Sequence, residues 1–185
     1  MLQDIPEEFY EFESQQPFHN CIECGKKLDG QTPYMIEKAL RKYPGYTAID
    51  TIIDYAICMD CAMEMRNSLS VHSREQMDAF FSQHMSKLEF ARKEDGSIDV
   101  DKCLSKCLVT GKSVGEMKEY QIYALCQGDK LSDMVPPYLV SEEAIEMLLP
   151  LLSSETTDFL TGFLNKHFSP DPSIMEPIGP KLILV

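Results

Sequence analysis

Four cysteines in two Cys-x2-Cys pairs are the residues of this 185-residue chain whose types and spacing best suit chemistry. Cys21 and Cys24 form the first pair, and Cys58 and Cys61 form the second. Such a turn can aim two sulfur atoms at one point about 2.3 Å from each, and zinc prefers four ligands in a tetrahedron. Gly25 follows the first pair and suits a tight turn. The pattern predicts one structural Zn²⁺ ion bound by four thiolates.

Catalysis by these thiols is the first alternative. A dithiol such as Cys58 and Cys61 at the start of a helix can act in redox chemistry, because a helix N-terminus lowers the pKa of a thiol. The βαβ context of thioredoxin-like proteins is missing, however. A zinc ion with four protein ligands has no open position for water, and the chain has no glycine-rich phosphate-binding loop. The sequence therefore favours a non-enzymatic role over a thiol redox or metal-dependent enzyme.

Two strands and a helix must position these pairs. Residues 33–37 have the composition of a short strand, and at 47–57 every second residue from Thr47 to Ile57 is apolar, aromatic or β-branched. This period of two predicts a strand with one buried face, which ends directly at Cys58. The stretch after it contains no helix breaker and predicts a helix opened by Cys61. The segment between the two cysteine pairs is thus expected to be a β-hairpin.

A knuckle, then a hairpin, then ligands on the first turn of a helix resembles the treble-clef and zinc-ribbon families. The resemblance rests on Cys21-x2-Cys24-Gly25 and Cys58-x2-Cys61 and covers about residues 18–70. It implies an α+β fold with a structural zinc ion whose binding energy is largely folding energy. It also implies partner recognition or nucleic-acid binding more than catalysis.

Further elements are expected outside this unit. Residues 73–76, Ser-Arg-Glu-Gln, have the form of a capping box and predict the start of a second helix. A strand is expected at 119–125, and two more helices are expected to open at Ser141 and near Ser154. The proline-rich segment 170–185 ends in apolar residues that should dock on the body.

A polar segment at 93–97 that contains glycine is the expected domain boundary. The first domain, 1–95, would hold an acidic arm, the four-cysteine unit and a helix. The second domain, 96–185, would hold a degenerate related unit with a strand, two helices and the apolar tail. The two units are expected to pack through helices rich in Met, Leu and Phe.

A weak internal repeat underlies the idea of a related second unit. Residues 21–26 align with 107–112 without a gap, and after an 18-residue deletion Cys58 falls on Cys126. Thr110 then stands in place of Cys24 and Asp129 in place of Cys61, so the second unit has either lost its metal or recruited other ligands. The weaker candidates for a second metal site are Cys103, Cys107, Cys126 and Asp129.

Charge narrows the possible partners. The chain has 17 Lys+Arg against 30 Asp+Glu, a formal net charge of -13. Nucleic-acid binders normally present a basic face, so a nucleic-acid-associated regulator is only the second alternative. A protein partner or self-association fits the acidic surface better. With no signal peptide, no membrane-spanning apolar run and an odd number of cysteines, the expected location is the cytoplasm and no membrane contact is expected.

Overall fold

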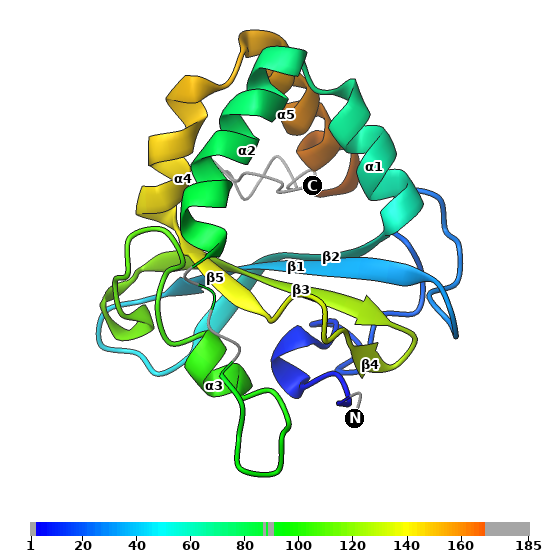
Figure 1. Cartoon of the computed structure of the whole chain (residues 1–185), viewed down its shortest axis with the longest axis vertical. Coiled ribbons are helices and arrows are strands. Elements are labelled where there is room, and N and C mark those ends of the chain that lie inside the picture. The colour runs from blue at the N-terminus through cyan, green and yellow to red at the C-terminus, as the bar shows by residue number, and fades with distance from the viewer. Residues whose placement is uncertain (1–2, 87, 89–90, 169–185) are drawn as a thin grey trace.

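The computed structural model describes residues 3–86, 88 and 91–168. Within them the chain is a mixed α+β fold with an antiparallel sheet and five α-helices, which confirms the predicted fold class (Figure 1). The expected docking of the segment 170–185 lies outside the described residues. In chain order the elements are η1 (Glu7–Phe9), β1 (Pro33–Lys42), β2 (Ile49–Cys58), α1 (Met59–Ser68), α2 (Val71–Met85), α3 (Val100–Cys103), η2 (Val114–Glu116), β3 (Glu119–Gln127), β4 (Lys130–Leu131), β5 (Tyr138–Ser141), α4 (Glu142–Leu148), η3 (Leu149–Leu151) and α5 (Ser154–Phe168).

Strand β1 lies at the centre of the sheet. It pairs with β2 on one side and with β3 on the other, and β3 also pairs with the short strands β4 and β5. The predicted hairpin between the two cysteine pairs is therefore present as β1 and β2. The pairing of β1 with β3 joins the segments before and after residue 95 in one continuous sheet.

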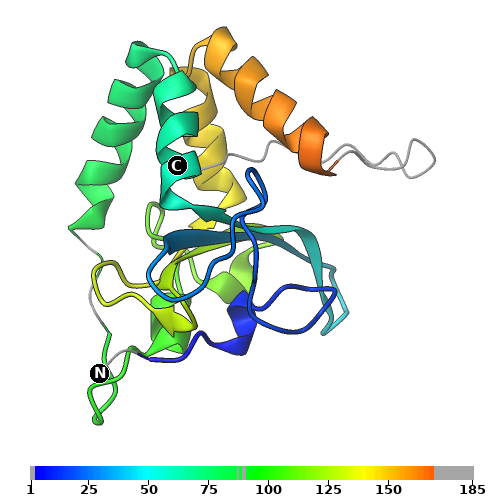
Figure 2. The same cartoon turned by 90° about the vertical axis from the view of Figure 1, so that its right-hand side faces the viewer.

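Helices cover one face of this sheet. Figures 1 and 2 show α1, α2, α4 and α5 on that face, while η1 and α3 lie on the opposite face. On the helical side, Tyr55 packs its ring 5.6 Å from that of Phe163 in α5. On the other side, Lys38 donates a hydrogen bond to the carbonyl of Tyr10 in the N-terminal arm. Both faces of the central strand are therefore buried, as expected for a sheet packed between two layers.

Two element boundaries differ from those that the sequence predicts. Strand β1 continues beyond 33–37 to Lys42, because neighbouring strands on both sides supply its hydrogen bonds despite its charged residues. Helix α2 begins at Val71, with Ser70 rather than Ser73 as its N-cap. The Ser70 hydroxyl accepts the backbone N–H of Ser73 at 3.1 Å, so Ser73 lies inside the first turn.

Candidate metal centre

The first cysteine pair lies on a tight turn before β1. The N–H of Cys21 donates to the carbonyl of Lys26 at 2.8 Å, and the N–H of Gly25 donates back to the carbonyl of Cys21 at 2.9 Å. Gly25 has φ +69°, the left-handed region that glycine adopts without strain. The turn is docked on the outer edge of β2, because the N–H of Ile22 donates to the carbonyl of Ala56 at 2.9 Å.

The second pair lies where strand β2 passes into helix α1. Cys58 is the last residue of β2 and the N-cap position of α1, and Cys61 is on the first helical turn. The backbone N–H of Cys58 also donates to the sulfur of Cys21 at 3.4 Å. The strand therefore delivers one sulfur to the turn and the helix delivers the other, as the sequence predicts.

The four sulfur atoms lie close enough together to bind one metal ion. The ligand atoms of Cys21, Cys24, Cys58 and Cys61 all lie within 4.8 Å of one another, and the sulfurs of Cys24 and Cys58 are 3.9 Å apart. A tetrahedral zinc ion with bonds of about 2.3 Å would hold its sulfur ligands roughly 3.8 Å apart. The cluster thus has the donor set and the dimensions for a metal ion. Cys24 is exposed and the other three side chains are buried, so one edge of the site faces solvent.

The protonation of these thiols depends on burial and on backbone donors. Burial alone would raise the pKa of the Cys21 thiol, but hydrogen bonds from the backbone at Cys24 and Cys58 outweigh it and lower that pKa to about 7. Burial raises the pKa of the Cys58 and Cys61 thiols, and the sulfur of Cys21 adds to the increase in both. A divalent metal bound between the sulfurs would favour the thiolate forms of Cys58 and Cys61, because its positive charge offsets theirs.

Charged side chains connect the turn to other elements. Lys26 lies 3.3 Å from Asp60 of α1, with both side chains exposed. Glu23 accepts from Lys166 at 2.5 Å and lies 2.8 Å from His167, both near the end of α5. The Lys166 contact is the main reason that the pKa of Glu23 is lowered. The turn thus contacts the last described helix of the chain as well as α1.

The candidates for a second metal site do not converge in the same way. Among the described residues, the Cys21 cluster is the one group of three or more His, Cys, Asp or Glu side chains that could hold a metal ion. Cys103 is the last residue of α3, and Cys126 lies in β3 opposite Tyr34 of β1. Asp129 is in the turn between β3 and β4, where its carbonyl accepts the N–H of Ile5.

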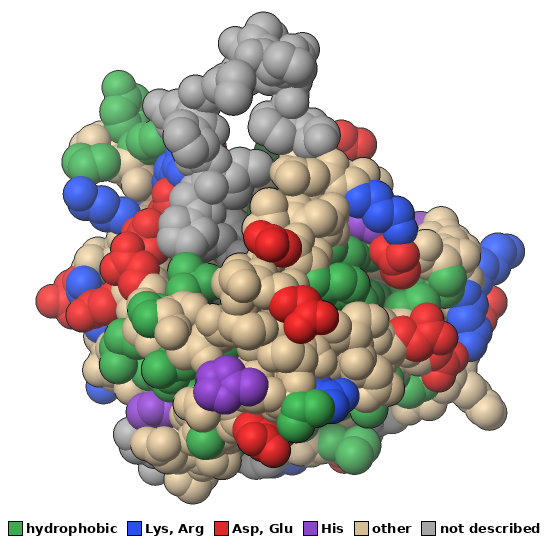
Figure 3. Space-filling model, turned by 90° about the horizontal axis from the view of Figure 1, so that it is seen from above, with side chains coloured by type: hydrophobic (Ala, Val, Ile, Leu, Met, Phe, Trp, Pro, Cys, Tyr) green, Lys and Arg blue, Asp and Glu red, His purple; other side chains and the backbone are tan. Residues whose placement is uncertain are grey.

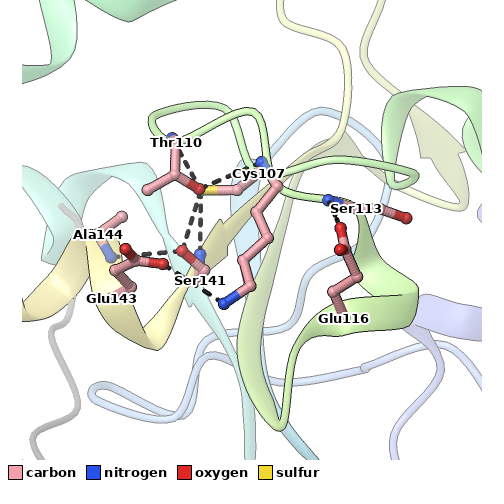
Figure 4. A network of polar contacts seen from close by, with 8 residues as sticks. Cys107, Thr110, Ser113, Glu116, Ser141, Glu143 and Ala144 are labelled. Atoms are coloured by element: carbon pink, nitrogen blue, oxygen red, sulfur yellow. Dashed lines mark hydrogen bonds and ion pairs between the residues drawn. The ribbon is translucent and has the colours of Figure 1, made fainter.

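Cys107 has different neighbours from those that the sequence suggested. Figure 4 shows its sulfur surrounded by hydrogen-bond donors from Thr110 and Ser141. The N–H and the hydroxyl of Ser141 donate to it at 3.3 and 3.2 Å, and the N–H of Thr110 donates at 3.4 Å. Burial would raise the pKa of Cys107, but these donors lower it. The Ser141 hydroxyl also caps α4, accepting the N–H of Ala144 at 3.3 Å.

A buried carboxylate on the helical face of the sheet was also missed by sequence reasoning. Glu37 of β1 is 2% exposed and accepts hydrogen bonds from Tyr55 Oη at 2.7 Å and Gln121 Nε2 at 3.0 Å. Burial and the carboxylate raise the pKa of Tyr55 well above its ordinary value. This cluster joins β1, β2 and β3 side by side. Its members come from three distant segments, so only the strand pairing reveals them.

No protein-family model, curated protein or solved structure matches this chain. A functional assignment must therefore rest on the geometry of the site itself. None of the helices in the described part of the chain has the length and apolarity needed to cross a membrane.

Proposed function

We propose that this chain is a non-enzymatic protein-interaction or regulatory module whose fold is stabilised by one zinc ion bound to Cys21, Cys24, Cys58 and Cys61. The observation that carries the proposal is the convergence of four sulfur atoms within 4.8 Å, from two Cys-x2-Cys turns on different elements. Four thiolates favour zinc over calcium or magnesium, which prefer oxygen ligands. The order of turn, hairpin and helix fits a treble-clef-like unit.

A structural role is supported by the closed ligand set. Four protein ligands complete the tetrahedral shell of zinc, so no position remains for a reactive water. The ion would tie the turn before β1 to the N-terminus of α1, and its binding energy would become folding energy. The alternative, redox chemistry at Cys58 and Cys61, is disfavoured because both side chains are buried and their thiol pKa values are raised rather than lowered.

The proposed partner is a basic or neutral protein, or a second copy of this chain. The formal net charge of -13 disfavours nucleic acid at all but very low salt. On the face shown in Figure 3, Lys and Arg side chains are dispersed among Asp and Glu and form no continuous basic stripe. The nucleic-acid alternative would require such a stripe.

Zinc content and thiol accessibility together test this role. We expect about one zinc per purified chain and protection of the four ligand thiols against an alkylating reagent until a chelator removes the metal. Rapid oxidation and reduction of Cys58 and Cys61 in the metal-loaded protein would instead support the redox enzyme. A chain that folds and protects these thiols without any metal would refute the structural role.

We also propose that the second half of the chain is a related unit without a metal of its own. The turn at Cys107 supports this relation, because it repeats the hydrogen bonds of the turn at Cys21. The N–H of Cys107 donates to the carbonyl of Lys112 at 2.9 Å, and the N–H of Gly111 donates to the carbonyl of Cys107 at 2.9 Å. Gly111 has φ +71° and so also adopts the left-handed region.

A further inference from the structure

The two halves of the chain correspond along most of their described length. The turn at Cys21 and strand β1 match residues 86 positions later, whereas the end of β2 and helices α1 and α2 match residues 83 positions later. With the second spacing, Cys58 corresponds to Ser141, and α2 (Val71–Met85) corresponds to α5 (Ser154–Phe168), which has the same length. Cys126, the counterpart expected from sequence, is not at the equivalent position.

The sheet places these halves around an approximate two-fold axis. Glu37 of β1 lies directly opposite Tyr123 of β3, and the two are 86 positions apart. Tyr34 lies opposite Cys126, and Leu40 lies opposite Tyr120. The residue 86 positions after Tyr34 is Tyr120, and the residue 86 positions before Cys126 is Leu40, so the correspondence turns the first pair into the second. This is the pattern of a self-complementary two-fold interface.

The start of helices α2 and α5 repeats this exchange. The N–H of Ser70 donates to Thr156 Oγ1 at 3.1 Å, and the N–H of Ser153 donates to Ser73 Oγ at 2.9 Å. The hydroxyl oxygens of Ser70 and Ser153 are 2.9 Å apart. Each contact is the counterpart of the other after a shift of 83 positions. The axis therefore passes through the sheet and through this serine pair.

The same correspondence identifies the residues of the second half that stand where the first half has its four cysteines. Leu108 N–H donates to the carbonyl of Leu139 at 2.8 Å, as Ile22 does to Ala56 in the first half. Ser141 N–H donates to the sulfur of Cys107 at 3.3 Å, as Cys58 does to that of Cys21. The counterparts of Cys21, Cys24, Cys58 and Cys61 are Cys107, Thr110, Ser141 and Ala144.

We propose that the chain is an internal two-fold duplication, and that hydrogen bonds to Cys107 replace the metal of the second half at a latent zinc site. This inference rests on the proposed zinc site of the first half. The Ser141 hydroxyl stands where the Cys58 sulfur is and donates to Cys107, while the side chain of Ala144 is fully buried where Cys61 provides a ligand. The backbone that would aim four ligands at one point is retained, and only three side chains have lost their sulfur.

Restoring those three sulfurs tests the inference. The triple variant Thr110→Cys/Ser141→Cys/Ala144→Cys should bind about two zinc ions per full-length chain, against about one for the unmodified protein. Cobalt titration should double the tetrahedral thiolate absorption. As a matched control, the variant Cys107→Ser/Ser141→Cys/Ala144→Cys has only two sulfurs at the site and should stay at about one zinc, whereas adding Cys126→Ala to the triple variant should leave it at two.

The outcomes separate this inference from the proposed function. An unmodified chain that binds no zinc refutes the proposed function, whereas one zinc in both the unmodified chain and the folded triple variant refutes the latent site. Because Ala144 is fully buried, the larger cysteine there can prevent folding. The double variant Thr110→Cys/Ser141→Cys retains Ala144 and offers three sulfurs with Cys107. It should bind a second cobalt ion, and failure to exceed the unmodified chain overturns the inference.

Discussion

Replacing Cys24 by serine separates metal binding from packing, because Cys24 is the exposed member of the cluster. A surface substitution away from other features changes the free energy of unfolding by no more than about 0.5 kcal/mol. In the presence of a chelator, Cys24→Ser should therefore unfold in urea almost as the unmodified chain does. Any larger loss in the presence of zinc must come from the ion.

The expected loss with zinc follows from the number of ligands. Structural zinc binding of up to about 16 kcal/mol, shared by four thiolates, gives about 4 kcal/mol per ligand, or about a 1,000-fold loss of affinity. At free zinc 1,000 times the dissociation constant, the ion stabilises the unmodified fold by about 4.1 kcal/mol and the variant by about 0.4 kcal/mol. The difference between them should be about 3–4 kcal/mol.

Urea denaturation followed by circular dichroism, with buffered free zinc and with chelator, measures both differences. Cys103→Ser is the control, because Cys103 is partly buried at the end of α3 and is not a member of the cluster. Its effect should be the same in both conditions. Equal losses for Cys24→Ser with zinc and with chelator would contradict the reasoning, as would no loss in either.

Three further predictions concern the turns, the buried carboxylate and alkaline pH. Gly25→Ala and Gly111→Ala should each lower the free energy of unfolding of the metal-free protein by about 1–2 kcal/mol. Both glycines have positive φ, and no neighbour contacts the added methyl, so backbone strain is the cause. Only Gly25→Ala should also weaken zinc binding in a competition titration. Glu37→Leu should cost about 2–6 kcal/mol in urea unfolding, because two buried donors lose their acceptor, and a loss below about 1 kcal/mol would contradict this. Burial raises the pKa of the Cys126 thiol to about 12, so the folded state favours the neutral thiol. The contribution of Cys126 to stability is therefore intact below pH 9 and is lost as the pH rises toward 12. Over this pH range the urea midpoint of Cys126→Ala should fall less than that of the unmodified chain.

The local parts of the fold could be predicted from the sequence. The alternation at 47–57 and the two Cys-x2-Cys spacings are short-range patterns, and they correctly indicate a hairpin that leads into a helix at Cys58. The expected capping box at 73–76 was wrong by three residues. Ser70 and Ser73 have equally suitable side chains, and the contact of Ser73 with the N–H of Ser153 becomes visible only after folding.

The long-range parts could not be predicted. The predicted alignment of the repeat matched cysteine with cysteine and so paired Cys58 with Cys126, whereas the proposed duplication pairs Cys58 with Ser141, because both are N-cap residues of a helix that follows a strand. The burial of Glu37 depends on the register between β1 and β3, which no local pattern contains.

The proposed duplication makes one half of the molecule an internal control for the other. Removal of the proposed zinc ion would leave the buried thiols near the turn at Cys21 without a common cation, while the sulfur of Cys107 would keep its donors from Ser141 and Thr110. Hydrogen exchange measured with and without chelator should therefore accelerate at the amides of Cys21 and Gly25, and the matching amides of Cys107 and Gly111 should remain protected. Equal acceleration in both turns would mean that the metal stabilises the whole fold as a single unit. No change in either turn would mean that the cluster folds without an ion, which contradicts the structural role of zinc.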